Sequence, residues 1–249
     1  MKKYIYFILF SVTPFLTAQT NNLVEYSMEY KDGNNDIENE YLVFNEYEIF
    51  YANLQNTNRL NFEDEKLKKV NYQYEPIYVD LKKDSIYQMK IGIFNPNSSE
   101  LKRFIAGEAV PNISWKISKE SLKILNYTCY KATTTFRGRE YTAWFTPELP
   151  FNYGPWKLQG LPGLILKADT DMFSYEAKRI VLNSDKIPRL NDLSFLSKAK
   201  VKHTMRESFD YENNWLENMR ANIYASLPPG AKIKEKPLRG DVRELSLDE

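Results

Sequence analysis

The feature that most constrains the fold of this chain is a period-two alternation of apolar and polar residues, which returns in short stretches along most of its length. Clusters of turn-forming residues separate these stretches, for example at 31–35 and at 95–99. Many short strands divided by frequent turns are typical of an antiparallel sandwich, barrel or half-barrel. The alternation predicts strands at 23–30, 40–44, 47–52, 70–74, 77–81, 85–94, 104–110 and 114–118.

The C-terminal part has a different pattern, because residues 191–199 and 203–226 have the apolar spacing of helices. In the second of these, the apolar side chains recur at steps of three and four, apart from a seven-residue gap that Glu212 bridges, and Pro228 and Pro229 end the pattern. Such a stripe can cover one face of a sheet. We therefore predict a mainly β fold, a curved antiparallel sheet or half-barrel with C-terminal helices packed on it.

The first 18 residues have the composition of a secretory signal peptide. Lys2 and Lys3 precede a mostly apolar stretch over 4–16, and Ala18 is a small residue at a plausible cleavage site. The alternative is a retained membrane anchor. The prediction is a signal peptide at 1–18, one β-rich domain with its helices at 19–230, and a charged, flexible tail at 231–249. The mature chain, without a transmembrane segment, is then expected to be periplasmic or extracellular.

Charge and composition exclude several classes of function. The 34 Lys and Arg residues nearly balance 33 Asp and Glu residues, which argues against nucleic acid as a partner. A single Cys cannot form an intramolecular disulfide, and a single His cannot build a multi-histidine zinc centre. No metal site and no cofactor is predicted.

The most informative stretch begins with a predicted hairpin over 125–146, whose turn is Arg137-Gly138. With this two-residue turn, one face is more apolar than the other and is expected to face the core. The second face places Lys131 opposite Trp144, a possible cation–π pair. The register pairs Phe136 with Arg139, Thr134 with Tyr141, Ala132 with Ala143 and Tyr130 with Phe145.

Two loops that contain proline or glycine follow the hairpin. Pro147 and Pro150 end its second strand, and Gly154 and Pro155 interrupt the next segment. Pro162-Gly163 is predicted to form the centre of a type II turn. The apolar run 164–166 that follows is expected to be buried on both faces.

These segments together resemble the GLPGLI family, whose name repeats the run 160–165. The resemblance covers about 115–168 and implies a secreted or periplasmic, β-rich protein of a Gram-negative bacterium, without established catalytic residues. The hairpin also looks like that of lipoprotein-carrier half-barrels, a likeness of fold alone. The positions that carry the resemblance include Cys129, Gly138, Gly154, Pro155, Gly160, Leu161, Pro162, Gly163, Leu164 and Ile165.

Two groups of residues are candidates for ligand binding. Arg137 and Arg139 flank Gly138 and can clamp an anion such as a carboxylate, unless they are a solvated hairpin tip. Aromatic residues crowd the same region, and they either line a concave apolar groove or pack in the core. Among them, Trp144, Tyr153 and Trp156 are the candidate groove residues.

Candidate catalytic groups are few. Cys129 with His203 as its base is the only possible Cys–His pair, and a structural role for each residue is the alternative. Glu148, Asp169 and Asp171 are carboxylates that can serve a hydrolase, or simply lie in solvated turns. No residue is assigned a catalytic role.

The sequence therefore favours a non-enzymatic binding or accessory protein of the cell envelope that holds an apolar ligand, a peptide or an envelope protein on an aromatic-lined concave face. Two alternatives stay open. One is an envelope hydrolase using the carboxylates near Glu148, Asp169 and Asp171, and the other is an interaction subunit of a secretion or outer-membrane transport complex.

Overall fold

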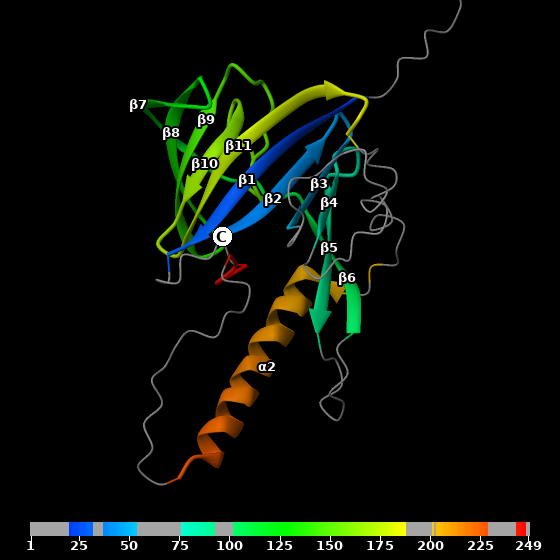
Figure 1. Ribbon diagram of the computed structural model, residues 1–249. Coiled ribbons are helices and arrows are strands. Elements are labelled where there is room, and N and C mark those ends of the chain that lie inside the picture. Colours follow the sequence, from blue (N-terminus) through cyan, green and yellow to red (C-terminus); the bar gives the residue numbers. More distant parts are fainter. Residues whose placement is uncertain are drawn as a thin grey trace, which may run out of the picture.

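The fold is a curved, open sheet with a helix near its C-terminal end, as a computed structural model shows (Figure 1). The structure describes residues 20–31, 37–53, 76–92, 102–187, 201, 203–228 and 243–247. The prediction of a mainly β fold is confirmed. The strands are β1 (Asn21–Tyr30), β2 (Ile37–Phe44), β3 (Glu48–Asn53), β4 (Ile77–Asp80), β5 (Ser85–Gly92), β6 (Lys102–Ala109), β7 (Lys116–Ile124), β8 (Tyr127–Phe136), β9 (Arg139–Thr146), β10 (Leu164–Asp169), β11 (Phe173–Ser184) and β12 (His203–Thr204).

Two antiparallel meanders, β1–β6 and β7–β11, are joined side by side into one sheet. Its strand order is β12-β6-β5-β4-β3-β2-β1-β11-β10-β9-β8-β7. The joint is the antiparallel pair of β1 and β11, in which Glu25 lies opposite Arg179 and accepts a 2.9 Å hydrogen bond from it. Only β12 departs from the antiparallel pattern among the described strands, since it pairs with β6 in parallel. The sheet therefore depends on contacts between segments far apart in the sequence.

The main core lies on one face of this sheet, which we call the core face. Alternate residues of β1 and β2 contribute Val24, Tyr26, Leu42 and Phe44, all of them buried. The Tyr26 hydroxyl donates a 2.8 Å hydrogen bond to the carbonyl of Ile165, and burial raises the pKa of Tyr26 well above its ordinary value. This bond ties β1 to the run 164–166, whose three side chains are fully buried, as the sequence predicted.

The predicted hairpin is confirmed in its register. Phe136 lies opposite Arg139, and Ala132 lies opposite Ala143. The face that the sequence assigned to the core is buried at most positions, although Tyr130 is more than a third exposed. Lys131 lies opposite Trp144, as the register predicts, and its ammonium forms an ion pair with Glu120, 3.0 Å from both carboxylate oxygens.

The turn at Pro162-Gly163 differs from the prediction. A type II turn needs a φ near +80° at its third residue, whereas Gly163 has a φ of 153°. Its N–H donates to the carbonyl of Leu161 at 2.8 Å, which closes a tighter, three-residue turn. The tighter turn brings Gly163 against the end of β9.

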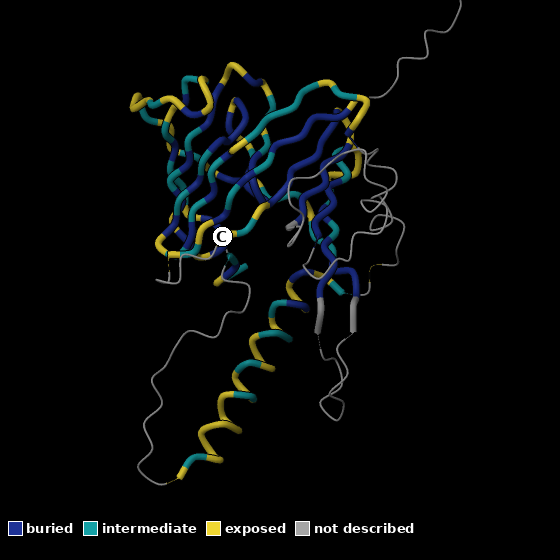
Figure 2. Tube along the Cα trace, viewed as in Figure 1, coloured by how far each residue is buried: buried dark blue, intermediate teal, exposed yellow. Residues whose placement is uncertain are grey.

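The helix α2 (Met205–Ser226) packs on the sheet only through its first turns. It begins with a capping box between Thr204 and Glu207, and its described buried residues are Met205 and Ser208. Farther along, Trp215 is 41% exposed, and the helix projects away from the sheet (Figure 2). The expectation that its apolar stripe covers the sheet is wrong, because the gap at Glu212 interrupts the stripe, and Glu212 instead pairs with the buried Lys90 of β5 at 3.4 Å.

Other predictions fall partly outside the described residues. The signal peptide at 1–18, the strand at 70–74 and the helix at 191–199 lie there. Within the described part of the chain, no helix is long and apolar enough to cross a membrane. The charged tail differs from expectation at 243–247, where the chain lies against the core face and Glu244 is buried.

Candidate functional site

The tip of the β8–β9 hairpin directs an arginine into the fold. Both turn residues have positive φ, 54° at Arg137 and 74° at Gly138, as a type I′ turn requires. The Arg137 side chain is only 6% exposed. The alternative of a solvated hairpin tip is therefore wrong for Arg137.

A strained loop places a lysine beside this arginine. Trp156 adopts a φ of 57°, which is unusual for a bulky side chain, and its ring packs 5.6 Å from the ring of Phe136. Just before it, Gly154 has no room for a side chain, since a Cβ there would lie 2.8 Å from the Cβ of Ile165. This loop fixes Lys157, whose side chain is fully buried.

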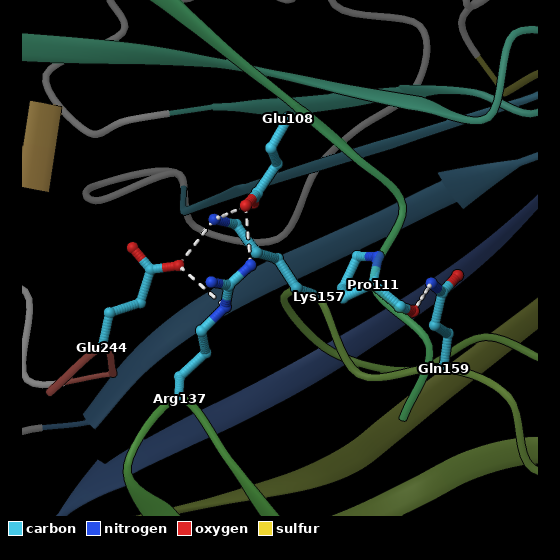
Figure 3. Close-up of polar contacts among 6 residues, drawn as sticks. All are labelled: Glu108, Pro111, Arg137, Lys157, Gln159 and Glu244. Carbon is cyan, nitrogen blue, oxygen red and sulfur yellow. Dashed lines mark hydrogen bonds and ion pairs between the residues drawn. The ribbon is translucent and has the colours of Figure 1, made fainter. Parts of the chain in front are cut away.

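Four charged side chains meet at this point, which we call the charge cluster: Glu108, Arg137, Lys157 and Glu244 (Figure 3). The Lys157 ammonium lies 2.7 Å from a carboxylate oxygen of Glu108 and 2.7 Å from one of Glu244. Arg137 donates a 2.6 Å hydrogen bond to Glu108, and its Nε lies 3.7 Å from Glu244. Two positive and two negative charges thus balance in a buried place, where an isolated charge would be costly.

The members of the charge cluster come from separate parts of the chain. Glu108 lies on β6, Arg137 in the β8–β9 turn and Lys157 in the loop before β10. Glu244 belongs to the stretch 243–247, which we call the C-terminal segment. The view in Figure 3 shows the four side chains pointing toward one another from these elements.

The C-terminal segment is held by a small set of contacts. The backbone N–H groups of Leu245 and Ser246 donate to the carbonyl of Arg137 at 2.9 Å and 3.4 Å. Arg243 donates a 2.7 Å hydrogen bond to Glu40, which is buried on β2. A Cβ on Gly138 would lie 3.0 Å from the Cβ of Leu245, so the glycine serves both the turn and the close approach of this segment.

The second arginine of the predicted clamp lies in a different contact. Arg139 donates a 2.9 Å hydrogen bond to Asp171, which is 75% exposed, and its guanidinium lies 5.8 Å from the ring centre of Phe173. Arg137 and Arg139 therefore bind separate carboxylates. The structure does not bring them to one anion.

The three aromatic residues that were candidates for lining a groove also lie in different places. Trp156 is buried in the core beside Phe136. Tyr153 is half-buried and meets the ring of Phe44 edge-on at 5.4 Å. Trp144 is half-buried and alternates along β9 with the buried Ala143 and Phe145, so it points to the opposite face of the sheet. These residues do not line a common surface.

The candidate catalytic carboxylates make local contacts. Glu148 accepts a 2.8 Å hydrogen bond from the backbone N–H of Thr128. Asp169 lies 3.7 Å from the ammonium of Lys31, and Asp171 is bound by Arg139. In the parts of the chain that the structure describes, no group of three or more His, Cys, Asp or Glu side chains could hold a metal ion.

The Cys–His pair is not assembled. Cys129 lies on β8, and His203 lies on β12 at the far end of the strand order, with nine strands between them. The His203 ring packs edge-on against Phe104. Burial raises the pKa of the Cys129 thiol to about 11, assisted by the negative charge of Glu148. This is the opposite of what an activated nucleophile requires.

We expect Cys129 to react slowly with a thiol reagent such as 5,5′-dithiobis(2-nitrobenzoic acid). With its pKa raised from 9.0 to about 11, the native thiolate fraction at pH 8 falls by about 100-fold. Labelling of the native protein should therefore be at least that much slower than labelling in urea. Equal rates in both conditions would show that the thiol is not buried.

The same shift has a consequence for stability. The thiol keeps its proton up to a higher pH in the folded state than in the unfolded state. The folded state is therefore favoured fully below about pH 9, and this contribution to the free energy of unfolding is lost as the pH rises toward 11. The free energy of unfolding of the wild type should fall more steeply over this range than that of Cys129→Ala. Parallel pH dependences of the free energy of unfolding for the two proteins would contradict this effect of the Cys129 thiol.

Sequence reasoning missed three members of the charge cluster: Glu108, Lys157 and Glu244. Lys157 directly follows the loop at 154–156, and this position inside a segment of special backbone was the available signal. No such signal marks Glu108 or Glu244, because acidic residues are common at the ends of strands and in charged tails.

Comparisons with known proteins support the fold and assign no activity to the chain. The model of a family described as protein of unknown function (Porph_ging) matches residues 135–167, which is compatible with the GLPGLI resemblance. No curated protein matches the sequence.

Among solved structures, PNGF-II is similar in two crystal forms, with TM-scores of 0.53 and 0.54 and 20% identity. The match covers 77% of this chain but only 32% and 33% of PNGF-II, so the chain spans about a third of that protein's length. A LolA superfamily protein, NE2245 from Nitrosomonas europaea, matches with a TM-score of 0.26 and 9% identity over 73% of this chain and 91% of that one. The likeness to PNGF-II extends to the fold alone, and the LolA match is too weak to carry an argument.

Proposed function

We propose that this chain is an exported, non-enzymatic binding or accessory protein of the cell envelope, which holds a polypeptide partner on the core face of its sheet. The observation that carries the proposal is the charge cluster. There, two buried cations receive a carboxylate from a segment of polypeptide that lies on the sheet, 87 residues along the chain from Lys157. A face that binds one segment of polypeptide can bind another.

Export rests on the sequence of residues 1–18, with its two lysines, apolar stretch and Ala18. A polypeptide is favoured over an apolar small molecule, because Trp156 packs in the core while Trp144 points to the opposite face of the sheet. The hydrolase alternative is disfavoured, because Glu148, Asp169 and Asp171 are each engaged in their own local contacts.

Site-specific photocrosslinking in the native host tests this function. A photoreactive residue at Asn112, which is exposed and follows Pro111, should yield a discrete adduct with another envelope protein. The Pro111 carbonyl accepts a hydrogen bond from Gln159, two residues after Lys157 (Figure 3). The same probe at Ile37, an exposed position at the start of β2, is the matched control and should not form that adduct. An adduct between the same two proteins should also form when the photoreactive residue is placed in the identified partner instead.

Two outcomes would overturn the proposal. One is an Asn112 probe that forms no adduct although the protein is exported and folded. The other is hydrolysis of a peptide, lipid or glycan by the purified protein that is lost in Asp169→Asn while the far-ultraviolet circular dichroism is unchanged.

A further inference from the structure

Three of the four charged residues in the charge cluster lie on the sheet or its short connections, and the fourth lies in the C-terminal segment. Arg137, Lys157 and Glu108 belong to the sheet and its short connections, in which the backbone is fixed by the type I′ turn and the strained loop at Trp156. Glu244 belongs to the C-terminal segment, which forms no strand or helix within 243–247. Without Glu244 the other three residues carry two positive charges and one negative charge, which leaves a net charge of +1 facing the place where its carboxylate lies.

We propose that Arg137 and Lys157 form a binding site for the carboxylate of an acidic peptide, and that Glu244 occupies this site within the chain. The site consists of a fully buried ammonium and a guanidinium that is 6% exposed, both preorganised by their loops. This inference rests on the proposed function and names the class of partner: a segment of another polypeptide with a glutamate at the position of Glu244.

The contacts of the C-terminal segment define that ligand further. Glu40 accepts a hydrogen bond from the arginine that precedes Glu244, and the Arg137 carbonyl accepts hydrogen bonds from the two N–H groups that follow it. Leu247 packs near the cluster of Phe104, Ala106 and Met205. A ligand that repeats these contacts has the pattern arginine, glutamate, two unspecified residues and a leucine.

The internal segment should compete with such a ligand. A segment on the same chain acts at an effective concentration that can reach about the millimolar range, so it masks the site from a weakly binding peptide. Glu244→Gln removes the charge with little change in size. The loss of a charge-assisted hydrogen bond in a buried site should weaken the internal competitor, and the affinity for an added peptide should therefore rise by about tenfold or more.

The test is fluorescence anisotropy with the full chain and a labelled, amidated peptide that has the sequence of residues 241–249. Glu244→Gln should bind this peptide at least tenfold more tightly than the wild type does. The same peptide with glutamine in place of its first glutamate should bind that variant at least tenfold more weakly. Glu120→Gln is the matched control and should behave as the wild type, since Glu120 forms an exposed pair with Lys131 outside the site.

Equal binding of the two peptides, or no binding by a Glu244→Gln protein whose circular dichroism is native, would overturn the site. A second measurement needs only the wild type, in case the variant does not fold. Saturating peptide should speed hydrogen exchange at the amides of Leu245 and Ser246, which are bonded to the Arg137 carbonyl. Unchanged exchange at saturation would place the peptide elsewhere and refute the proposal. A crosslinked partner without peptide binding would reject this site and leave the proposed function standing.

Discussion

Gly163→Ala should destabilise the protein by more than about 4 kcal/mol and leave little of it soluble and folded. A Cβ at this position would lie 2.1 Å from the carbonyl oxygen of Thr146 and 2.9 Å from the Cα of Pro147. Both are backbone atoms at the end of β9, so neither can turn aside as a side chain can. Accommodating the methyl group would separate the loop from β9 just where β10 begins.

Gly160→Ala is the matched control three residues earlier. Gly160 has a φ of 90°, but the nearest atoms to a Cβ there lie 3.8 Å away, so its alanine variant carries backbone strain without a clash. Its loss should be about 1–2 kcal/mol, the ordinary cost of a left-handed residue. Soluble yield and urea unfolding followed by circular dichroism measure both variants. Similar losses for the two would show that the contact with Thr146 does not limit the fold.

The hairpin at 125–146 was predictable because its information is local. The turn dipeptide Arg137-Gly138 fixes the loop length, and the alternation then fixes which residues lie opposite one another. The structure confirms that register from Tyr130 to Phe145. The burial of residues 164–166 was predictable for a similar reason, since an uninterrupted apolar run can be stable only when both faces are covered.

The joint of the two meanders was not predictable. It pairs β1 with β11, and β11 itself was missed, because only Phe173, Tyr175 and Ala177 alternate clearly before a mixed stretch. Its pairing is fixed by contacts such as Glu25 with Arg179, which lie 154 residues apart. A pattern read along the chain does not contain such a partner.

The site was predicted in only one of its members. Arg137 was singled out as an anion ligand, and it does bind carboxylates, but Arg139 turned out to bind a different one. Lys157 has the sequence character of a surface residue, and its burial follows from the tight packing of the loop at Gly154 and Trp156. A buried charge of this kind becomes visible only once its counter-charges from β6 and the C-terminal segment are in place.

Lys157→Met should lower the free energy of unfolding by about 3–5 kcal/mol, although methionine fills much the same volume. The side chain of Lys157 is fully buried and lies 2.7 Å from both Glu108 and Glu244. Its loss leaves two buried carboxylates to share Arg137. Because a domain is usually stable by only 5–15 kcal/mol, roughly speaking, urea unfolding should detect this loss readily.

Lys131→Met is the matched control, since Lys131 also pairs with a glutamate, Glu120, but both side chains are partly exposed. Its loss should be under about 1 kcal/mol. The double variant Lys157→Met with Glu244→Gln restores the charge balance around the 2.6 Å pair of Arg137 and Glu108, and it should be more stable than Lys157→Met alone. If Lys157→Met costs no more than Lys131→Met, the buried charges do not depend on one another, and the site proposed at Arg137 and Lys157 loses its physical basis.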